Sequence, residues 1–229
     1  MKVLAIGSHP DDIEIFMFGF LNSCQDRGDK IFMAVATDGS VGGDNSGIDL
    51  AVQRESETKN GLYKLGKPKM LRFLDGNLHN EANAKTKIKE LINEINPDLI
   101  LTHAPEDYHT DHRTLSEYVR AVIGFKCPLI FADTLLGVNF IPEIYIDITK
   151  YFSSKKKAIL CHKSQNPKKF FEAVEIMNRY RAAQCNAPKG NYAEAYRLDK
   201  RFPFVDIRDL LPSSPAYRPF YQNDKDSLI

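Results

Sequence analysis

The chain of 229 residues is long enough for one large domain or barely two. Hydrophobic residues make up 43% and charged residues 27%, which is ordinary for a globular protein and excludes a wholly disordered chain. A formal net charge of +1 gives no reason to expect wholesale binding to nucleic acid or to an anionic membrane. We expect a single domain over residues 1–229, with an irregular tail over residues 212–229.

The four cysteines are widely spaced and form no C-x-x-C pair, so we expect free thiols in a reducing compartment. The first residues predict a core strand and not a signal peptide, and no apolar run approaches the length that spans a bilayer. A cytoplasmic location is therefore the default expectation.

The predicted elements alternate between strands and helices. In chain order we expect strands over residues 3–6, 30–39, 69–76, 98–104, 128–136 and 143–149, and helices over residues 12–26, about 49–66, about 81–95, within 105–119, 150–161 and 167–185. A glycine- and serine-rich loop is expected over residues 40–47. This alternation predicts an α/β, Rossmann-like three-layer fold, with a mainly parallel sheet covered by helices on both faces.

The turn after the first strand concentrates ionisable side chains, because His9, Asp11, Asp12 and Glu14 all follow within eight residues of the end of the strand. In open α/β sheets, ligands bind beyond the carboxyl ends of the strands. A dinucleotide-binding turn needs glycines here, and acidic side chains would repel its phosphate. Helix capping by the carboxylates is one interpretation, and metal ligation, which the histidine favours, is the other.

A second cluster follows the strand over residues 98–104. It comprises His103, Asp107, His109, Asp111 and His112. Both clusters emerge at the same edge of a parallel sheet, so we expect them to converge there at the carboxyl edge of the strands. A solvated polar loop is the alternative for either cluster taken alone.

The two clusters together supply what a catalytic metal site needs: three nitrogen or oxygen ligands, an open position for water, and a base beside it. We expect His9, Asp12 and His112 to be the ligands, with Asp11 free to accept a proton. Spacing alone leaves Zn²⁺, Fe²⁺ and other divalent ions open.

These residues carry a family resemblance. HPDDIE, followed by the segment HTDH and with R-x-x-E on the intervening helix, resembles the PIG-L/LmbE-like zinc-dependent N-deacetylases. The resemblance runs from Val3 to about Gln165, where KKKAILCHKSQ is similar to a further family segment, and YAEAY over residues 192–196 adds a weaker match.

The resemblance implies a zinc ion held by His9, Asp12 and His112, and Asp11 as the general base. It also implies the reaction, in which an N-acyl group, with acetyl the expected one, is removed from an amino sugar or sugar conjugate. The expected partner is thus a small N-acetylated sugar, and the oligomeric state stays open, a homo-oligomer included.

The resemblance gives three further residues a role. His109 matches a histidine that stabilises the oxyanion and protonates the leaving amine, and Asp111 matches the residue that orients it. Arg54 matches an arginine near the substrate; the alternative is a surface ion pair with Glu57 or Asp49.

The sequence departs from the family pattern at two places. Thr110 stands where proline is frequent, which leaves every functional side chain present. Phe18 and Phe20 flank Gly19 where small residues are usual, which bears on the helix packing near the pocket and on the acyl or sugar specificity.

Other hypotheses remain at this stage. They are an iron(II) oxygenase, a two-metal phosphoesterase, and a non-catalytic metal-binding module whose site a fourth protein ligand would close. Three further polar residues stay between a structural and a functional interpretation: Asp38, Asp75 and His162. We expect His79 to be an exposed loop histidine.

Overall fold

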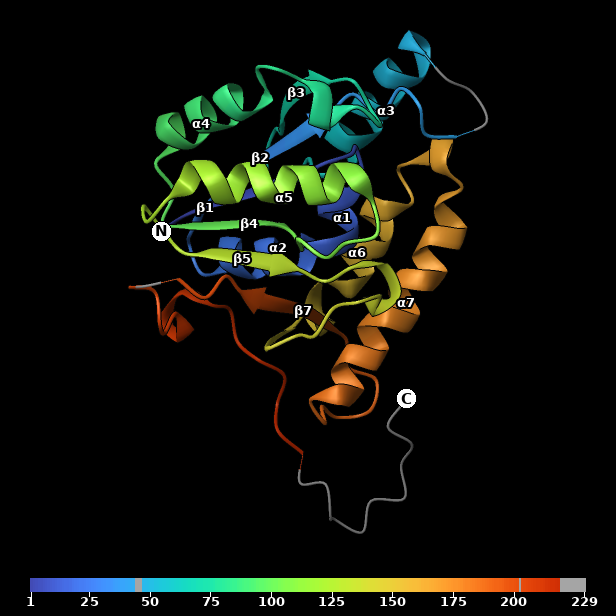
Figure 1. The fold of residues 1–229 in the computed structure, drawn as a ribbon. Coiled ribbons are helices and arrows are strands. Elements are labelled where there is room, and N and C mark those ends of the chain that lie inside the picture. The colour runs from blue at the N-terminus through green and yellow to red at the C-terminus, as the bar shows by residue number, and fades with distance from the viewer. Residues whose placement is uncertain (44–46, 202, 219–229) are drawn as a thin grey trace.

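The computed structural model describes residues 1–43, 47–201 and 203–218 (Figure 1). Within these ranges, one sheet contains seven strands in the order β3-β2-β1-β4-β5-β7-β6. The strands are β1 (Lys2–Gly7), β2 (Lys30–Thr37), β3 (Lys69–Phe73), β4 (Leu99–His103), β5 (Leu129–Ala132), β6 (Ile144–Asp147) and β7 (Ala193–Leu198). The five neighbouring strands β3, β2, β1, β4 and β5 are parallel to one another, and β7 is antiparallel to both β5 and β6.

Helices cover both faces of the sheet. Successive side chains of a strand point to opposite sides, and in β1 the side chains on both sides are apolar and have to be buried. Val3 and Ala5 of β1 join one apolar cluster, and Leu4 and Ile6 join the other. Helices α4 (Ala84–Ile95) and α5 (Thr110–Ile123) lie side by side over one face (Figure 1). The other face is covered by α1 (Asp12–Phe16), α2 (Phe18–Asp26), α6 (Phe152–Ile159) and α7 (Pro167–Gln184). Helix α3 (Ile48–Gly61) contacts α6. The predicted three-layer α/β fold with a mainly parallel sheet is confirmed.

Strand β1 lies at the point where the strand order reverses, between β2 and β4. The chain leaves β1 towards β2 on one side and later returns to place β4 on the other. At such a point the loops after the two strands diverge and leave a crevice between them. The HPDD turn follows β1, and His103 is the last residue of β4, so the fold brings the two predicted clusters to this crevice.

Two predicted elements differ from the structure. The expected helix over residues 12–26 is broken at Met17, and strand β7, which periodicity did not predict, completes the sheet between β5 and β6. Both differences involve Glu194 of β7. Its buried carboxylate accepts hydrogen bonds from the backbone N–H groups of Gly19 and Phe20 at 2.9 and 2.8 Å, and so caps a new helix start.

Glu194 also compensates a buried charge. Its carboxylate accepts hydrogen bonds from Lys155 Nζ and from the Tyr196 hydroxyl, both at 2.7 Å, and all three side chains are buried. Burial lowers the pKa of Lys155, which the facing carboxylate opposes. This cluster ties α2 and α6 to β7.

Two predicted irregular segments, the loop over residues 40–47 and the tail over residues 212–229, are described only in part. Residues 212–218 of the predicted irregular tail contain no helix or strand, and residues 219–229 lie outside the described residues, as do residues 44–46 of the predicted loop. Among the helices that the structure describes, none is both long and apolar enough to cross a membrane.

We expect Glu194→Gln to lower the free energy of unfolding by about 3–5 kcal/mol, because it leaves Lys155 charged and buried without a carboxylate. Chemical denaturation measures the change. Glu94→Gln is the control: its exposed pair with Lys69 should contribute no more than about 1 kcal/mol. Equal losses in the two variants would contradict the buried role of Glu194.

Candidate active site

The carboxyl ends of β1 and β4 open into a cavity of about 270 Å³. Its polar lining consists of His9, Asp11, Asp12, Arg54, Asp75, Tyr108, His109, His112 and Gln165. Its apolar lining consists of Ile15, Phe16, Val41, Leu135 and Phe170. The HPDD turn and the HTDH segment thus converge, as the sequence predicts for two clusters at one sheet edge.

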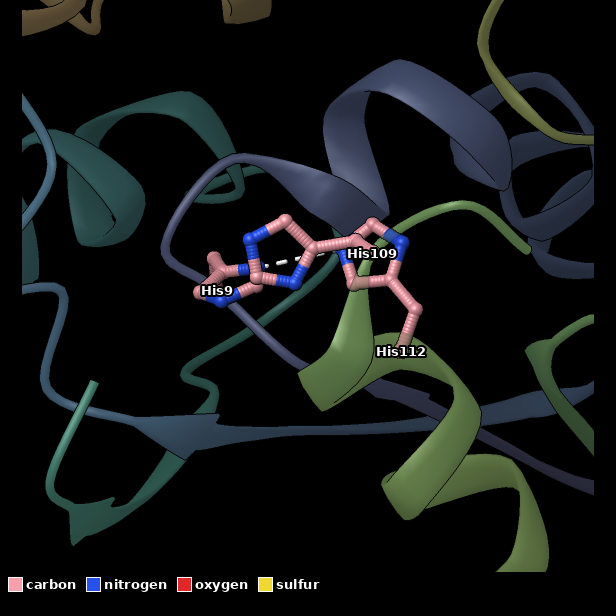
Figure 2. A group of neighbouring side chains, drawn as sticks. All are labelled: His9, His109 and His112. Carbon is pink, nitrogen blue, oxygen red and sulfur yellow. Dashed lines mark hydrogen bonds between the residues drawn. The ribbon is translucent and has the colours of Figure 1, made fainter. Parts of the chain in front are cut away.

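Donor atoms of three side chains from the two segments lie close together. His9 Nδ1 is 3.1 Å from His112 Nε2 (Figure 2). The Asp12 carboxylate completes the group, with one oxygen 3.4 Å from His9 Nδ1 and the other 3.3 Å from His112 Nε2. These are three side chains that could share one metal ion.

The outer nitrogens of both histidines face carboxylates. His9 Nε2 is 3.2 Å from Asp75 and 3.4 Å from Asp111, and His112 Nδ1 is 3.0 Å from Asp107. Such partners hold a ligating imidazole in orientation and fix its tautomer. The contact of Asp75 with His9 is not predicted from the sequence, although Asp75 follows closely after β3 and so lies at the same sheet edge.

The cluster carries a surplus of negative charge. Burial by itself lowers the pKa of an imidazole, but the facing carboxylates outweigh it, and raise the pKa of His9 well above its ordinary value and that of His112 to about 9. Burial raises the pKa of Asp12, but His112 and His103 outweigh it and hold that pKa well below its usual range. The site therefore favours positive charge, which arrives as protons on the imidazoles or as a metal cation.

Asp11 occupies a strained backbone conformation, with φ 142° and ψ −22°. Conformations of this kind cost about 1–3 kcal/mol in a residue with a side chain and gather at functional sites. Its side chain is 13% exposed and lines the cavity beside the donor atoms. Burial raises the pKa of the Asp11 carboxyl, and the Arg54 guanidinium opposes the rise.

Arg54 is buried, with 3% of its surface exposed. It forms an ion pair with Asp11 at 3.3 Å and lies 3.7 Å from Asp75. The alternative of a surface ion pair is wrong: Asp49 is exposed, and Glu57 accepts hydrogen bonds from Gln53 and Ser164 instead.

His109 lies on the cavity wall at the start of α5, 4.5 Å from His9 between ring centroids (Figure 2). The backbone N–H of Asp111 donates to His109 Nδ1 at 3.2 Å, so the neutral ring carries its proton on Nε2. The Asp111 carboxylate faces elsewhere: it accepts hydrogen bonds from the N–H groups of Gly76 and Leu78 and faces His9. The contact between Asp111 and His109 thus runs through the backbone and not through the carboxylate.

His103 lies next to the donor group and contacts it through Asp12. Its Nε2 is 3.0 Å from Asp12, and it accepts the backbone N–H of Ser8 at the same distance. With Asp12 and His112, His103 forms a second group close enough to share a metal ion. Stacking on His112, with ring centroids 3.7 Å apart, makes His103 a support for the site.

Several other positions that the sequence singled out lie outside the cavity wall. Neither Phe18 nor Phe20 lines the cavity; both are buried in the core, and a side chain on Gly19 between them would collide with Ile148. The helix packing near the site is therefore close despite the two phenylalanines. Asp38 accepts hydrogen bonds from the backbone of Ser40 and Asp75, as a turn cap does, and His79 is exposed.

The HKSQ segment packs behind the site and does not enter it, except at its last residue. His162 Nε2 lies 2.8 Å from Glu14, and both side chains are buried. Gln165 lines the cavity and donates to the carbonyl of Gly42. Glu14 thus joins α1 to the segment after α6 and takes no part in the donor group.

Comparison with known proteins accords with this geometry. The family model PIG-L, described as GlcNAc-PI de-N-acetylase, matches residues 4–123. The diacetylchitobiose deacetylase of Thermococcus kodakarensis is 30% identical over 220 residues, which span 86% of this chain and 82% of the relative. The chain therefore belongs to the PIG-L family of N-deacetylases, and the expectation of a deacetylase is confirmed.

Solved structures share the fold. The N,N′-diacetylchitobiose deacetylase of Pyrococcus horikoshii matches with a TM-score of 0.72 and 24% identity, over 92% of this chain and 88% of the other. GalB, the 4-carboxy-2-hydroxymuconate hydratase of Pseudomonas putida, matches with a TM-score of 0.77 and 16% identity, over 90% and 99% of the two chains. The same architecture thus carries different reactions, and the side chains of the site have to decide between them.

The pair of His162 and Glu14 predicts a pH-dependent contribution to stability. Burial lowers the pKa of His162, but Glu14 outweighs it, so the folded-state pKa is raised above the ordinary value. The contribution is complete below the unfolded pKa of about 6.5 and is lost as the pH rises through the folded pKa. We expect His162→Gln to cost about 1.5–3 kcal/mol at pH 6 and less at pH 9, by chemical denaturation.

His79→Gln is the control, because His79 is exposed and should change stability little at either pH. A loss in His162→Gln that is the same at both pH values would show that the pair contributes no charge interaction.

Proposed function

We propose that the protein is a zinc-dependent hydrolase that removes an N-acyl group, with acetyl the expected one, from an amino sugar or sugar conjugate. The observation that carries the proposal is the donor group of His9, Asp12 and His112, with Asp11 beside it on the wall of one cavity. Membership of a deacetylase family and similarity to a diacetylchitobiose deacetylase support the reaction and the substrate class.

The donor group fits a zinc ion. Ligand atoms bound tetrahedrally at about 2.0–2.1 Å lie about 3.3–3.4 Å apart. The separation between His9 Nδ1 and His112 Nε2 is 3.1 Å. One Asp12 oxygen lies 3.4 Å from His9 Nδ1 and the other lies 3.3 Å from His112 Nε2, so a small movement of the carboxylate would place one of its oxygens beside an ion shared with the two imidazoles. When bound, zinc lowers the pKa of a coordinated water to about 7 and polarises the amide carbonyl.

In the proposal, the chain's own residues move the protons. Asp11 accepts the proton of the attacking water on its carboxylate, as a general base. His109 donates a hydrogen bond from Nε2 to the developing oxyanion, and the proton that Asp11 has accepted passes on to the departing amine. Asp111 holds the His109 ring through its backbone N–H, and its carboxylate holds His9.

The cavity favours a small substrate group. Its volume of about 270 Å³ suits one sugar unit with its acyl group better than a large ligand. Arg54, which the resemblance assigns to the substrate, lines the same cavity. Phe16 lies beside His112 in an edge-to-face contact and provides an apolar wall next to the reacting centre.

We expect the purified protein to release free amine from one or more members of a panel of N-acetylated sugars, N,N′-diacetylchitobiose among them. Removal of metal with a chelator should abolish the release, and added Zn²⁺ should restore it, because the proposal needs the metal ion to lower the pKa of the attacking water. Failure to release amine from every member would contradict the proposal. Two metal ions per chain by elemental analysis would favour the phosphoesterase alternative.

Two variants separate the base from the ligands. Asp11→Asn should lower kcat by about 10²–10⁴-fold and leave the zinc content unchanged, because it removes a proton acceptor of the same shape. His112→Ala should lose zinc, because it removes one of three ligands. Amine release and elemental analysis of both variants measure this. Near wild-type kcat in zinc-loaded Asp11→Asn would rule out Asp11 as the base.

A further inference from the structure

We propose that Arg54 is a positioning residue, which holds Asp11 in its strained backbone conformation and so fixes the carboxylate at the reacting centre. This inference rests on the proposed function, in which Asp11 is the general base. It assigns Arg54 a role through Asp11, where the family resemblance implies a contact with the substrate.

The hydrogen bonds of Arg54 are directed at the HPDD turn. Its Nη2 donates to the carbonyl of Pro10 at 3.1 Å and to the carboxylate of Asp11 at 3.3 Å. Its Nη1 donates to the carbonyl of Gly39, on the loop after β2, at 3.1 Å. One guanidinium therefore binds both the carbonyl of Pro10, which precedes the strained residue, and the side chain of the strained residue Asp11.

The backbone of Asp11 needs such support. With φ 142° and ψ −22°, it lies where residues with side chains persist only if their surroundings impose the conformation. On the helix side, the carbonyl of Asp11 accepts the N–H of Ile15 at 3.0 Å. On the strand side, the N–H of His9 donates to the Asp12 carboxylate at 2.6 Å and the N–H of Asp12 donates to the carbonyl of His9 at 3.2 Å. The contacts of Arg54 with Pro10 and Asp11 are the ones that reach Asp11 itself from outside the turn.

The surroundings of Arg54 leave its guanidinium little freedom to turn towards a ligand. A Cβ on Gly39 would lie 2.9 Å from its Cδ and Nε, and one on Gly42 would collide with Nη1. Both positions are glycine, so the loop closes directly over the guanidinium. The side chain is 4% exposed, which suits an arginine that acts on the protein better than one that reaches into the cavity.

The two roles differ in their kinetics. An arginine that binds the substrate throughout the reaction raises KM when it is removed, whereas one that positions the base lowers kcat. We expect Arg54→Gln to lower kcat by about 10- to 100-fold and to change KM within about threefold, with the zinc content unchanged. Arg54→Lys, which keeps the charge, should restore part of kcat.

The measurement uses zinc-loaded protein and N,N′-diacetylchitobiose, or whichever N-acetylated sugar of the panel the wild type cleaves. Arg201→Gln is the matched control, because Arg201 also donates to two backbone carbonyls, those of Gly124 and Arg120, and pairs with Asp199. It contacts the far end of α5, a helix of 14 residues and about 21 Å. Its kcat and KM should equal those of the wild type.

A double-mutant cycle with Asp11→Asn tests whether Arg54 acts through Asp11. If it does, Arg54→Gln should lower kcat by no more than about twofold once Asp11 is asparagine. Where the remaining turnover is too slow, calorimetry of the same sugar on Asp11→Asn, with and without Arg54→Gln, replaces it. Equal Kd values support positioning. A higher KM or Kd on loss of Arg54, with kcat unchanged, would overturn the proposal in favour of substrate binding.

A crystal structure of Arg54→Gln separates this inference from the proposed function. Should the wild type cleave no sugar of the panel, the deacetylase proposal fails while the positioning claim is still decided. An Asp11 that has left its positive φ, or whose carboxylate has moved, supports the claim. An Asp11 unchanged in both respects would overturn it.

Discussion

Four buried carboxylates converge at one edge of the sheet, those of Asp12, Asp75, Asp107 and Asp111. Carboxylates buried in this number are tolerated only with compensating positive charge or dense hydrogen bonding. The structure provides both. An imidazole faces each of the four carboxylates, and the backbone N–H groups of Gly76 and Leu78 donate hydrogen bonds to Asp111. The same excess of negative charge favours a bound cation, because a divalent ion would offset the charge that the protonated imidazoles offset.

The fold supplies the place and not the chemistry. A hydratase with the same architecture shows that strand order and helix layers do not choose the reaction. In this chain, the reversal of strand order between β1 and β4 opens a crevice, and whatever follows those two strands is presented there. The reaction is decided by the side chains of two short segments and by the partners that orient them.

Buried polar contacts join these segments to the later half of the chain. Glu14 on α1 meets His162 after α6, and Glu194 on β7 caps α2 and pairs with Lys155. Each contact spans more than a hundred residues or crosses between layers of the fold. A partner lost from such a contact leaves a charge without compensation, so these pairs specify where α1 and α2 stand relative to the sheet.

The sequence by itself determined the elements whose signals are local. The apolar strand before His9, the helix that starts after HTDH, and the alternation of strands and helices all depend on neighbouring residues, and they sufficed for the three-layer fold and for the convergence of His9, Asp12 and His112. Asp11 and Arg54 could also be picked out from the sequence as candidate site residues, because each belongs to a recognisable motif.

Only the tertiary structure decided what those residues touch. The start of α2 after the break at Met17 is capped by Glu194, which is 175 residues from Gly19 along the chain, and strand β7 is held by its pairing with β5 and β6. No local periodicity encodes such contacts. Asp75 became a partner of His9, and Arg54 a buried clamp on Pro10 and Asp11, because separate loops meet at one sheet edge. Sequence spacing fixes which side chains reach that edge, whereas the packing of the loops fixes which atoms face one another there.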